Sequence, residues 1–204
     1  MTEPIKFEVF FDYLCPFVYR VAGMLEAVGG SSAGRIEVGW RYFSLTQVNS
    51  NVDGWTVWDA PAGETVKGRL AFKAAEAARR QGRFGDLHMP LLKARHRDGL
   101  DIDDAAVIER VAGDAGLDVA RLRGDIAAPD ILEALARDHR HAVRELGVFG
   151  TPTFVFADGS AAYVRLSEPV AGTAAVDVFD RLLGVAAAEP RILEIKRPRR
   201  PTAG

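Results

Sequence analysis

The chain has one cysteine, Cys15, among its 204 residues, and this scarcity excludes several classes of protein. No disulfide can form within the chain, which excludes both a disulfide-stapled secreted fold and a dithiol active site. No histidine has metal-ligand spacing with the cysteine, so the sequence predicts no metal site. The simplest location for such a chain is the reducing cytosol.

The chain also lacks an excess of charge of one sign, and it lacks long apolar runs. The formal net charge is −2 and the isoelectric point is about 6.1, so we expect neither nucleic acid nor an anionic membrane as partner. We interpret the one basic run, residues 196–200, as a solvated tail. No apolar stretch approaches the roughly 20 residues that span a bilayer. The acidic Glu3 and Glu8 do not fit a signal peptide.

The periodicity of apolar residues predicts the order β-α-β, then a run of helices, then β-β-α. The expected strands are 6–11, 36–43, 153–157 and 161–166, and the expected helices are 19–28, 64–81, 84–97, 103–115, 118–125, 129–146 and 173–183. We expect Pro90 to bend or interrupt its helix and the region of Asp101 and Asp103 to cap the next one.

This order predicts an α/β protein with a thioredoxin fold that is split by an inserted all-helical domain. Residues 1–58 and 147–204 would form the thioredoxin-like domain, and residues 59–146 the helical domain. The Asp158-Gly159 pair between the last two strands is typical of a hairpin turn.

Cys15 lies where a strand is expected to end and a helix to begin, in a segment 12–17 that reads Asp-Tyr-Leu-Cys-Pro-Phe. Pro16 fits the first turn of a helix. Backbone N–H groups and the positive end of a helix dipole would stabilise a thiolate at this position. A buried and inert cysteine is the alternative, but the strand–turn–helix context favours a reactive thiol. Val18 occupies the position where a dithiol enzyme has its second cysteine.

Far downstream, Thr151 and Pro152 immediately precede an expected strand. A cis peptide bond between them would turn the backbone groups of Thr151 toward the thiol, where they could pair with an extended substrate. A trans proline that merely begins the strand is the alternative. The combination with Cys15 favours the cis form and indicates a thioredoxin-like redox site.

The histidines and tryptophans give weaker signals. His139 lies on the expected helix that leads to Thr151. We interpret His139 and His88 as surface or pocket-edge residues; the alternative is that one of them contacts a ligand. Trp55 and Trp58 lie in a loop, residues 49–63, that could form an apolar pocket wall or staple the helical insertion to the core; the sequence leaves both open.

These motifs resemble the DsbA-like branch of the thioredoxin superfamily over nearly the whole chain. That branch includes FrnE-type oxidoreductases, 2-hydroxychromene-2-carboxylate isomerases and kappa-class glutathione transferases. Three segments, 12–16, 43–45 and 193–197, are also similar to the actinobacterial mycothiol-dependent nitroreductase, and His139 falls where that protein has a histidine.

The resemblance implies that Cys15 is the nucleophile, that Pro152 is the cis proline, and that Thr151 holds the substrate. It implies a thiol-dependent oxidoreductase that uses a loosely bound low-molecular-weight thiol, mycothiol or glutathione, because Val18 leaves no internal resolving thiol. A thiol-dependent isomerase or transferase and a redox-inactive binding protein are the alternatives. The residues expected to bind substrate or cofactor are Tyr13, Pro16, Phe17, Val18 and His139, with Tyr13 and Phe17 at the mouth. The sequence does not indicate the small organic or disulfide substrate, nor whether the chain forms a homodimer.

Overall fold

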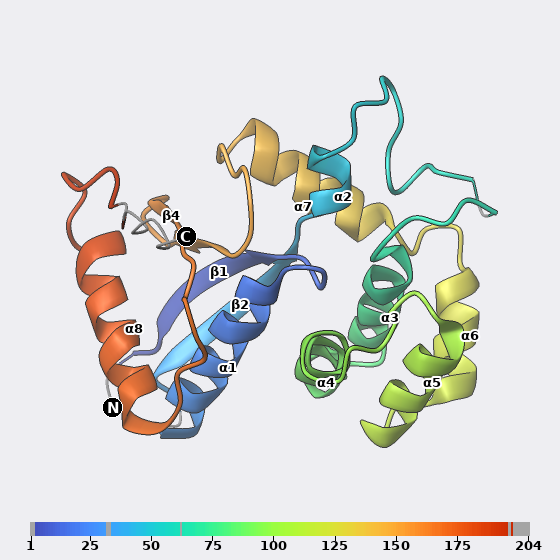
Figure 1. Cartoon of the computed structure of the whole chain (residues 1–204), viewed down its shortest axis with the longest axis horizontal. Helices are drawn as coiled ribbons and strands as arrows, with labels where there is room; N and C mark the ends of the chain where they lie inside the picture. Colours follow the sequence, from blue (N-terminus) through green and yellow to red (C-terminus); the bar gives the residue numbers. More distant parts are fainter. Residues whose placement is uncertain (1–2, 32–33, 62, 196, 198–204) are drawn as a thin grey trace, which may run out of the picture.

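The computed structural model describes residues 3–31, 34–61, 63–195 and 197, and within them it confirms the α/β thioredoxin fold (Figure 1). The strands are β1 (Ile5–Phe11), β2 (Ile36–Tyr42), β3 (Thr153–Phe156) and β4 (Ala161–Tyr163). The helices are α1 (Pro16–Ser31), α2 (Leu45–Val48), α3 (Arg69–Arg80), α4 (Phe84–His96), α5 (Ala105–Asp114), α6 (Val119–Ala127), α7 (Glu133–Arg144) and α8 (Gly172–Ala186).

The four strands form one sheet in the order β2-β1-β3-β4. β1 and β2 run parallel, as expected for a β-α-β crossover through α1. β3 lies antiparallel to β1, with Phe7 opposite Phe156, and pairs with β4 in the predicted hairpin. Gly159 has φ +84° in the hairpin turn, a conformation that favours glycine. The sheet thus places the ends of β1 and β3 side by side, although about 140 residues separate them in the chain.

Helices cover both faces of this sheet. On one face, α1 and α8 pack on an apolar cluster that includes Phe7, Val9, Met24, Phe154 and Phe179. On the other face, α7 contributes to a smaller cluster whose buried members are Phe10, Phe43, Ala142, Val148 and Val155. Since β1 and β3 are covered on both sides, their almost uninterrupted apolar sequences are explained.

Helices α3 to α6 form a helical block at one end of the sheet, where α4 packs against α1 (Figure 1). Five buried alanines along α3 let neighbouring helices approach closely; they are Ala71, Ala74, Ala75, Ala77 and Ala78. α7 packs against β2, although the predicted boundaries assign it to the helical domain. The division at residues 58/59 and 146/147 stays a prediction.

One local prediction about a helix end was wrong. The residue that caps α5 is Asp104, which accepts a hydrogen bond from the amide of Ala106. Asp103 instead accepts bonds from the amides of Gly68 and Leu70 and so caps the start of α3. Sequence spacing alone could not reveal this cap, because Asp103 is separated from Leu70 by 33 positions and from Gly68 by 35 positions.

Pro90 lies inside α4 and does not interrupt it, since the helix continues from Phe84 to His96. α2 is a short helix that the sequence analysis did not predict; its cap is Ser44, whose hydroxyl accepts a bond from the amide of Gln47. Every helix in the described ranges is too short or too polar to cross a bilayer. The predicted basic tail, residues 196–200, lies outside the described residues except for residue 197.

Candidate functional site

Cys15 lies at the junction between β1 and α1, in the tight turn that the sequence predicts. Its amide donates to the carbonyl of Asp12 at 3.1 Å, and its own carbonyl accepts from the amide of Val18 at 3.1 Å. The first bond closes the turn and the second begins the helix. The thiol therefore sits at the N-terminal end of a 16-residue helix, where the helix dipole favours negative charge.

The thiol of Cys15 is directly opposite Thr151. Its Sγ donates to the carbonyl oxygen of Thr151 at 3.2 Å, and the Thr151–Pro152 peptide bond is cis. Cys15 is only 4% exposed, and Thr151 is buried with a hydroxyl that has no hydrogen-bond partner in the part of the chain that the structure describes. The pairing of β1 with β3 thus brings together the two parts of the predicted redox site.

A buried carboxyl group fixes the turn that carries Cys15. Asp12 is fully buried, and its two carboxyl oxygens accept bonds from the amides of Leu14 (2.8 Å) and Leu45 (2.6 Å). Burial raises the pKa of Asp12 to about 6, although these two backbone bonds oppose the shift and the charge of Asp103 adds to it. Asp12 therefore fastens the cysteine turn to the start of α2, and the sequence analysis did not single it out.

Tyr13 does not line the mouth of the site, contrary to the prediction. It is 0% exposed, and its hydroxyl is hydrogen-bonded to Nδ1 of His88 at 3.1 Å. The carbonyl of Tyr13 accepts a second bond from Nε2 of His96 at 2.8 Å. Both histidines belong to α4, so the helical block holds the backbone and the side chain of the residue two positions before the cysteine.

His88 is a core residue rather than a pocket-edge residue. Its ring packs between Trp40, with ring centroids 4.2 Å apart, and Phe84, at 5.0 Å. Burial lowers its pKa to about 3, with a smaller contribution from the charge of Arg79. His88 is therefore neutral at physiological pH, and its Nε2 is buried without a partner among the described residues.

Phe17 and Pro16 do lie at the outer side of the site. Pro16 is exposed, and the half-buried ring of Phe17 is covered by the guanidinium of Arg165, whose Cζ lies 3.8 Å from the ring centroid. Val18 points the other way and is fully buried in the core cluster that also contains Cys15. The position of a second cysteine is thus filled by a packed aliphatic side chain.

A groove of about 760 Å³ begins beside the cysteine turn. Its lining residues are Leu14, Leu45, Thr46, Asn49, Ser50, Val52, Trp55 and Glu64. Trp55 forms part of its wall and donates from Nε1 to Glu64 at 2.9 Å. Trp58, in contrast, packs near His139 under the guanidinium of Arg140. Trp55 therefore forms part of a pocket wall, which is one of the two predicted roles, and Trp58 packs the same loop against α7.

His139 is buried at the other side of α2. Its Nδ1 accepts a bond from the amide of Ser44 at 3.1 Å, and its ring lies 4.7 Å from that of Phe43. Burial, with a smaller contribution from the charge of Arg140, lowers the pKa of His139 to about 4. These contacts give His139 a structural role in holding residue 44; its contact with a ligand stays a prediction.

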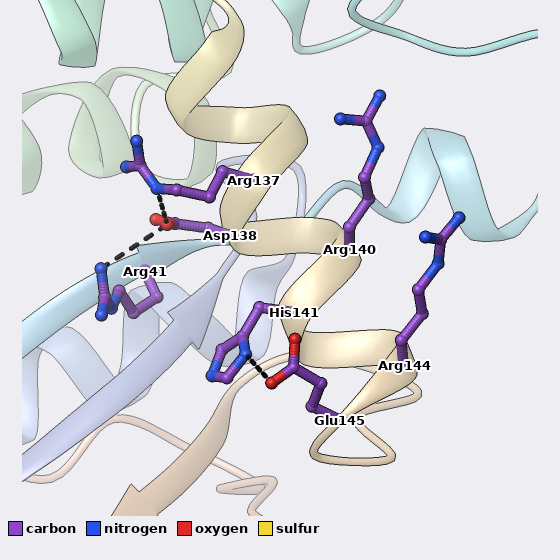
Figure 2. Close-up of a pocket in the computed structure, with 7 residues that line it drawn as sticks. All are labelled: Arg41, Arg137, Asp138, Arg140, His141, Arg144 and Glu145. Carbon is purple, nitrogen blue, oxygen red and sulfur yellow. Dashed lines mark ion pairs between the residues drawn. The ribbon is translucent and has the colours of Figure 1, made fainter.

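A second cavity, of about 480 Å³, lies along α7 and contains none of the predicted site residues (Figure 2). Asp138 pairs there with Arg41 and Arg137, and it also accepts from the amide of Tyr42. Figure 2 shows that the side chains of Arg140 and Arg144 extend away from Asp138. The ion pair between Arg41 and Asp138 connects β2 to α7.

Comparison with known proteins agrees with this geometry. The family model of the DSBA-like thioredoxin domain matches residues 6–184. The chain belongs to this family. The match includes both parts of the site and the whole helical block of this DSBA-like protein, as the sequence resemblance implied.

Individual relatives are distant. An uncharacterized protein of Bacillus subtilis, YwbO, is 24% identical over 207 residues, which cover 90% of this chain and 96% of YwbO. A probable DsbA oxidoreductase from Streptomyces coelicolor has a TM-score of 0.64 at 21% identity, covering 94% of both chains. A 2-hydroxychromene-2-carboxylate isomerase has a TM-score of 0.62 at 14% identity, covering 94% of this chain and 100% of the isomerase. At these identities the solved structures establish the fold of the DSBA-like protein and leave its reaction to be argued from the site.

Sequence reasoning missed Asp12 and Arg165. The available signal for Asp12 was its position, since it is the one acidic residue in the otherwise apolar run from Val9 to Val18. Arg165 gave no local signal, because its contact with Phe17 joins the segment after β4 to α1 across 148 positions of the chain.

Proposed function

We propose that this DSBA-like protein is a thiol–disulfide oxidoreductase that uses Cys15 and an external low-molecular-weight thiol. One observation carries the proposal: the Sγ of Cys15 lies at the start of α1 and 3.2 Å from the carbonyl of Thr151. The thiol has a hydrogen-bond acceptor on one side and a helix N-terminus on the other. This arrangement suits a group that alternates between a thiol, a thiolate and a mixed disulfide.

In the proposed reaction, the Cys15 thiolate attacks one sulfur of a disulfide. A mixed disulfide with Cys15 forms, and the other sulfur leaves as a thiolate. Because Val18 replaces an internal resolving cysteine, a second external thiolate attacks the mixed disulfide. It forms a new disulfide with the bound half and releases the Cys15 thiolate, so the protein is regenerated and the exchange is balanced.

The residues around Cys15 fit an external thiol substrate. The hydroxyl of Thr151 is buried and unpartnered among the described residues, so a hydrogen bond from a bound substrate would satisfy it. The groove beside Leu14 offers apolar surface for the organic part of the substrate. Asp12 does not touch sulfur in this scheme; its two backbone bonds keep the turn in place. Mycothiol and glutathione are the two thiols that we propose for this site.

The direct test is to trap the mixed disulfide. Incubation with glutathione disulfide or mycothiol disulfide should add the mass of one half-disulfide to the intact protein, and added free thiol should remove it. Cys15→Ser should give no adduct under the same conditions. A wild-type protein that forms no adduct with either compound, while a denatured sample does, would contradict the proposal.

A second candidate is a thiol-dependent isomerase or transferase, in which the sulfur of the bound thiol performs the chemistry. It is supported by the missing second cysteine and by the similarity in fold to the isomerase over that protein's full length. This alternative predicts saturable thiol binding that survives in Cys15→Ser. A redox-inactive binding protein, the third reading, predicts a Cys15 that reacts with disulfides no faster than a free thiol does.

A further inference from the structure

A cationic surface surrounds the first turn of α1 on the outer side of the site. The guanidinium of Arg165 lies over the ring of Phe17 at 3.8 Å, and that of Arg20 lies 5.2 Å from the same ring. Both are cation–π distances, so two positive groups lie beside this one ring. We call Phe17, Arg20 and Arg165 the cationic rim.

The backbone fixes the rim beside the reactive sulfur. Phe17 is two residues after Cys15 on α1. Arg165 follows Val164, whose amide donates to the carbonyl of Pro152 at 3.0 Å. Phe17 is therefore close to Cys15 along the chain, and Arg165 is next to the residue that is hydrogen-bonded to Pro152. In Figure 1 the segment after β4 descends past α1, and Arg20 fastens it there by donating to the carbonyl of Leu166 at 2.8 Å.

The positive charge of the rim is not neutralised by the protein. Within the part of the chain that the structure describes, neither Arg20 nor Arg165 has a carboxylate within ion-pair distance. Arg165 is exposed and Arg20 is half-buried, so both are reachable from solvent. The N-terminus of α1 adds a partial positive charge at the same place. An anion that approached Cys15 over Phe17 would meet both guanidinium groups and the N-terminus of α1.

We propose that the cationic rim makes the Cys15 site selective for disulfides and thiols that carry an anionic group near sulfur. This inference rests on the proposed function and specifies its substrate class. In the exchange, the anionic group would lie against the guanidinium groups while the Cys15 thiolate attacks the neighbouring sulfur and the other half leaves as a thiolate. Glutathione carries free carboxylates and fits this class, whereas mycothiol carries none.

The test compares three small disulfides of different charge: glutathione disulfide (anionic), 2-hydroxyethyl disulfide (neutral) and cystamine (cationic). Mixed-disulfide formation at Cys15 is followed by intact mass spectrometry, and each rate is divided by the rate of the neutral compound. Because the same disulfides are used throughout, comparing these ratios between variants removes the differences in intrinsic reactivity among the disulfides. We expect the anionic ratio to fall roughly fivefold in Arg165→Gln and in Arg20→Gln, because one unit charge at close range in water contributes about that much.

Three controls make the result specific. Arg110→Gln removes the same charge from an exposed position on α5, and it should leave both ratios unchanged. Arg165→Lys keeps the charge and should retain most of the preference, whereas Arg165→Glu should reverse it in favour of cystamine. Raising the salt concentration should reduce the anionic ratio of the wild-type protein, since the charges are exposed to solvent.

The outcomes separate the two proposals. If Cys15 reacts with the neutral disulfide, but the anionic ratio is the same in wild type, Arg165→Gln and Arg165→Glu, the charge selectivity is wrong and the oxidoreductase proposal stands. If no disulfide reacts with the folded wild-type protein, the oxidoreductase proposal itself fails. Thermal unfolding of each variant shows whether a lost preference comes from a lost fold.

Discussion

The hydroxyl of Tyr13 is 3.1 Å from Nδ1 of His88, and both side chains are buried where the cysteine turn meets the helical block. Each is the other's hydrogen-bond partner in an otherwise aromatic environment. The backbone of Tyr13 is held by the same helix through His96. The helical insertion therefore does more than cover the site, because it fixes the position of the residue that leads into Leu14 and Cys15.

A double-mutant cycle measures this link. Tyr13→Phe should lower the free energy of unfolding by about 1–3 kcal/mol, because it leaves a buried ring nitrogen without a partner. His88→Phe should cost a similar amount by orphaning the hydroxyl. The double variant should cost clearly less than the sum of the two, and denaturant unfolding of the four proteins gives the coupling energy. Additive losses would mean that the two groups do not interact.

Asp12 makes stability depend on pH in a defined direction. Its pKa is about 6 in the folded protein and near 3.8 when exposed, so the unfolded state loses its proton first as pH rises. Between about pH 4 and 6 this group therefore makes stability fall with increasing pH, by about 3 kcal/mol in all. Asp12→Asn should lack this contribution.

The measurement is the difference in unfolding free energy between Asp12→Asn and wild type from pH 3.5 to 7. That difference should shift in favour of the variant as pH rises to 6 and then level off. The difference removes the opposite effects of His88 and His139, whose lowered pKa values make the protein lose stability as pH falls from 6.5. The exposed Asp53→Asn controls for the loss of one negative charge. A difference that stays constant across the range would contradict the buried, ionisable state of Asp12.

Gly68 lies where the groove, the cysteine turn and α3 meet. Its φ is +77°, and an added Cβ would lie 3.1 Å from Cγ of Leu14. Gly68→Ala should therefore lower stability by about 1–2 kcal/mol and slow the reaction of Cys15 with disulfides. Gly29→Ala is the matched control, since it lies within α1 with open space around it and should be neutral or slightly stabilising. Thermal unfolding and the rate of mixed-disulfide formation test both variants.

Val18→Cys should restore a dithiol site. Val18 is at the second-cysteine position of the helix that begins after Cys15, and it is buried against the same core cluster. Mild oxidation of the variant should form an internal disulfide, seen as the loss of both free thiols, and the protein should gain insulin-reducing activity in the presence of a dithiol. Val21→Cys, one turn further along α1 and also buried, should show neither change. Two free thiols in oxidised Val18→Cys would show that the geometry differs from that of a dithiol site.

Sequence patterns were sufficient for the fold and for the pair of segments that form the site. The apolar run of β1, the Pro16 start of α1 and the Asp-Gly hairpin are all local signals, and each was found where the pattern predicts it. The contacts that the sequence could not reveal are those between distant elements. Asp103 has the same local signature as a cap for α5, yet its carboxylate caps α3.

The direction of a side chain in a tight turn is also beyond a periodic pattern. Tyr13 stands two residues before the cysteine in sequence, which suggested a place at the mouth, but residues in a turn follow neither the helical nor the strand period. Its burial results from α4, which supplies the histidine that its hydroxyl needs. His139 is similar: its position before Thr151 suggested a ligand contact, whereas its ring nitrogen holds the amide of Ser44.

The placement of β3 next to β1 has a consequence for how the protein acquires its site. Phe10 and Thr153 are paired in the sheet, yet the chain between them includes the whole helical block. Closing so long a loop costs conformational entropy, and such non-local pairings slow folding. Until that pairing forms, Cys15 has no Thr151 opposite it and stands open to reagents. The rate at which the Cys15 thiol becomes protected from reagents during refolding would therefore report the rate at which β1 and β3 pair.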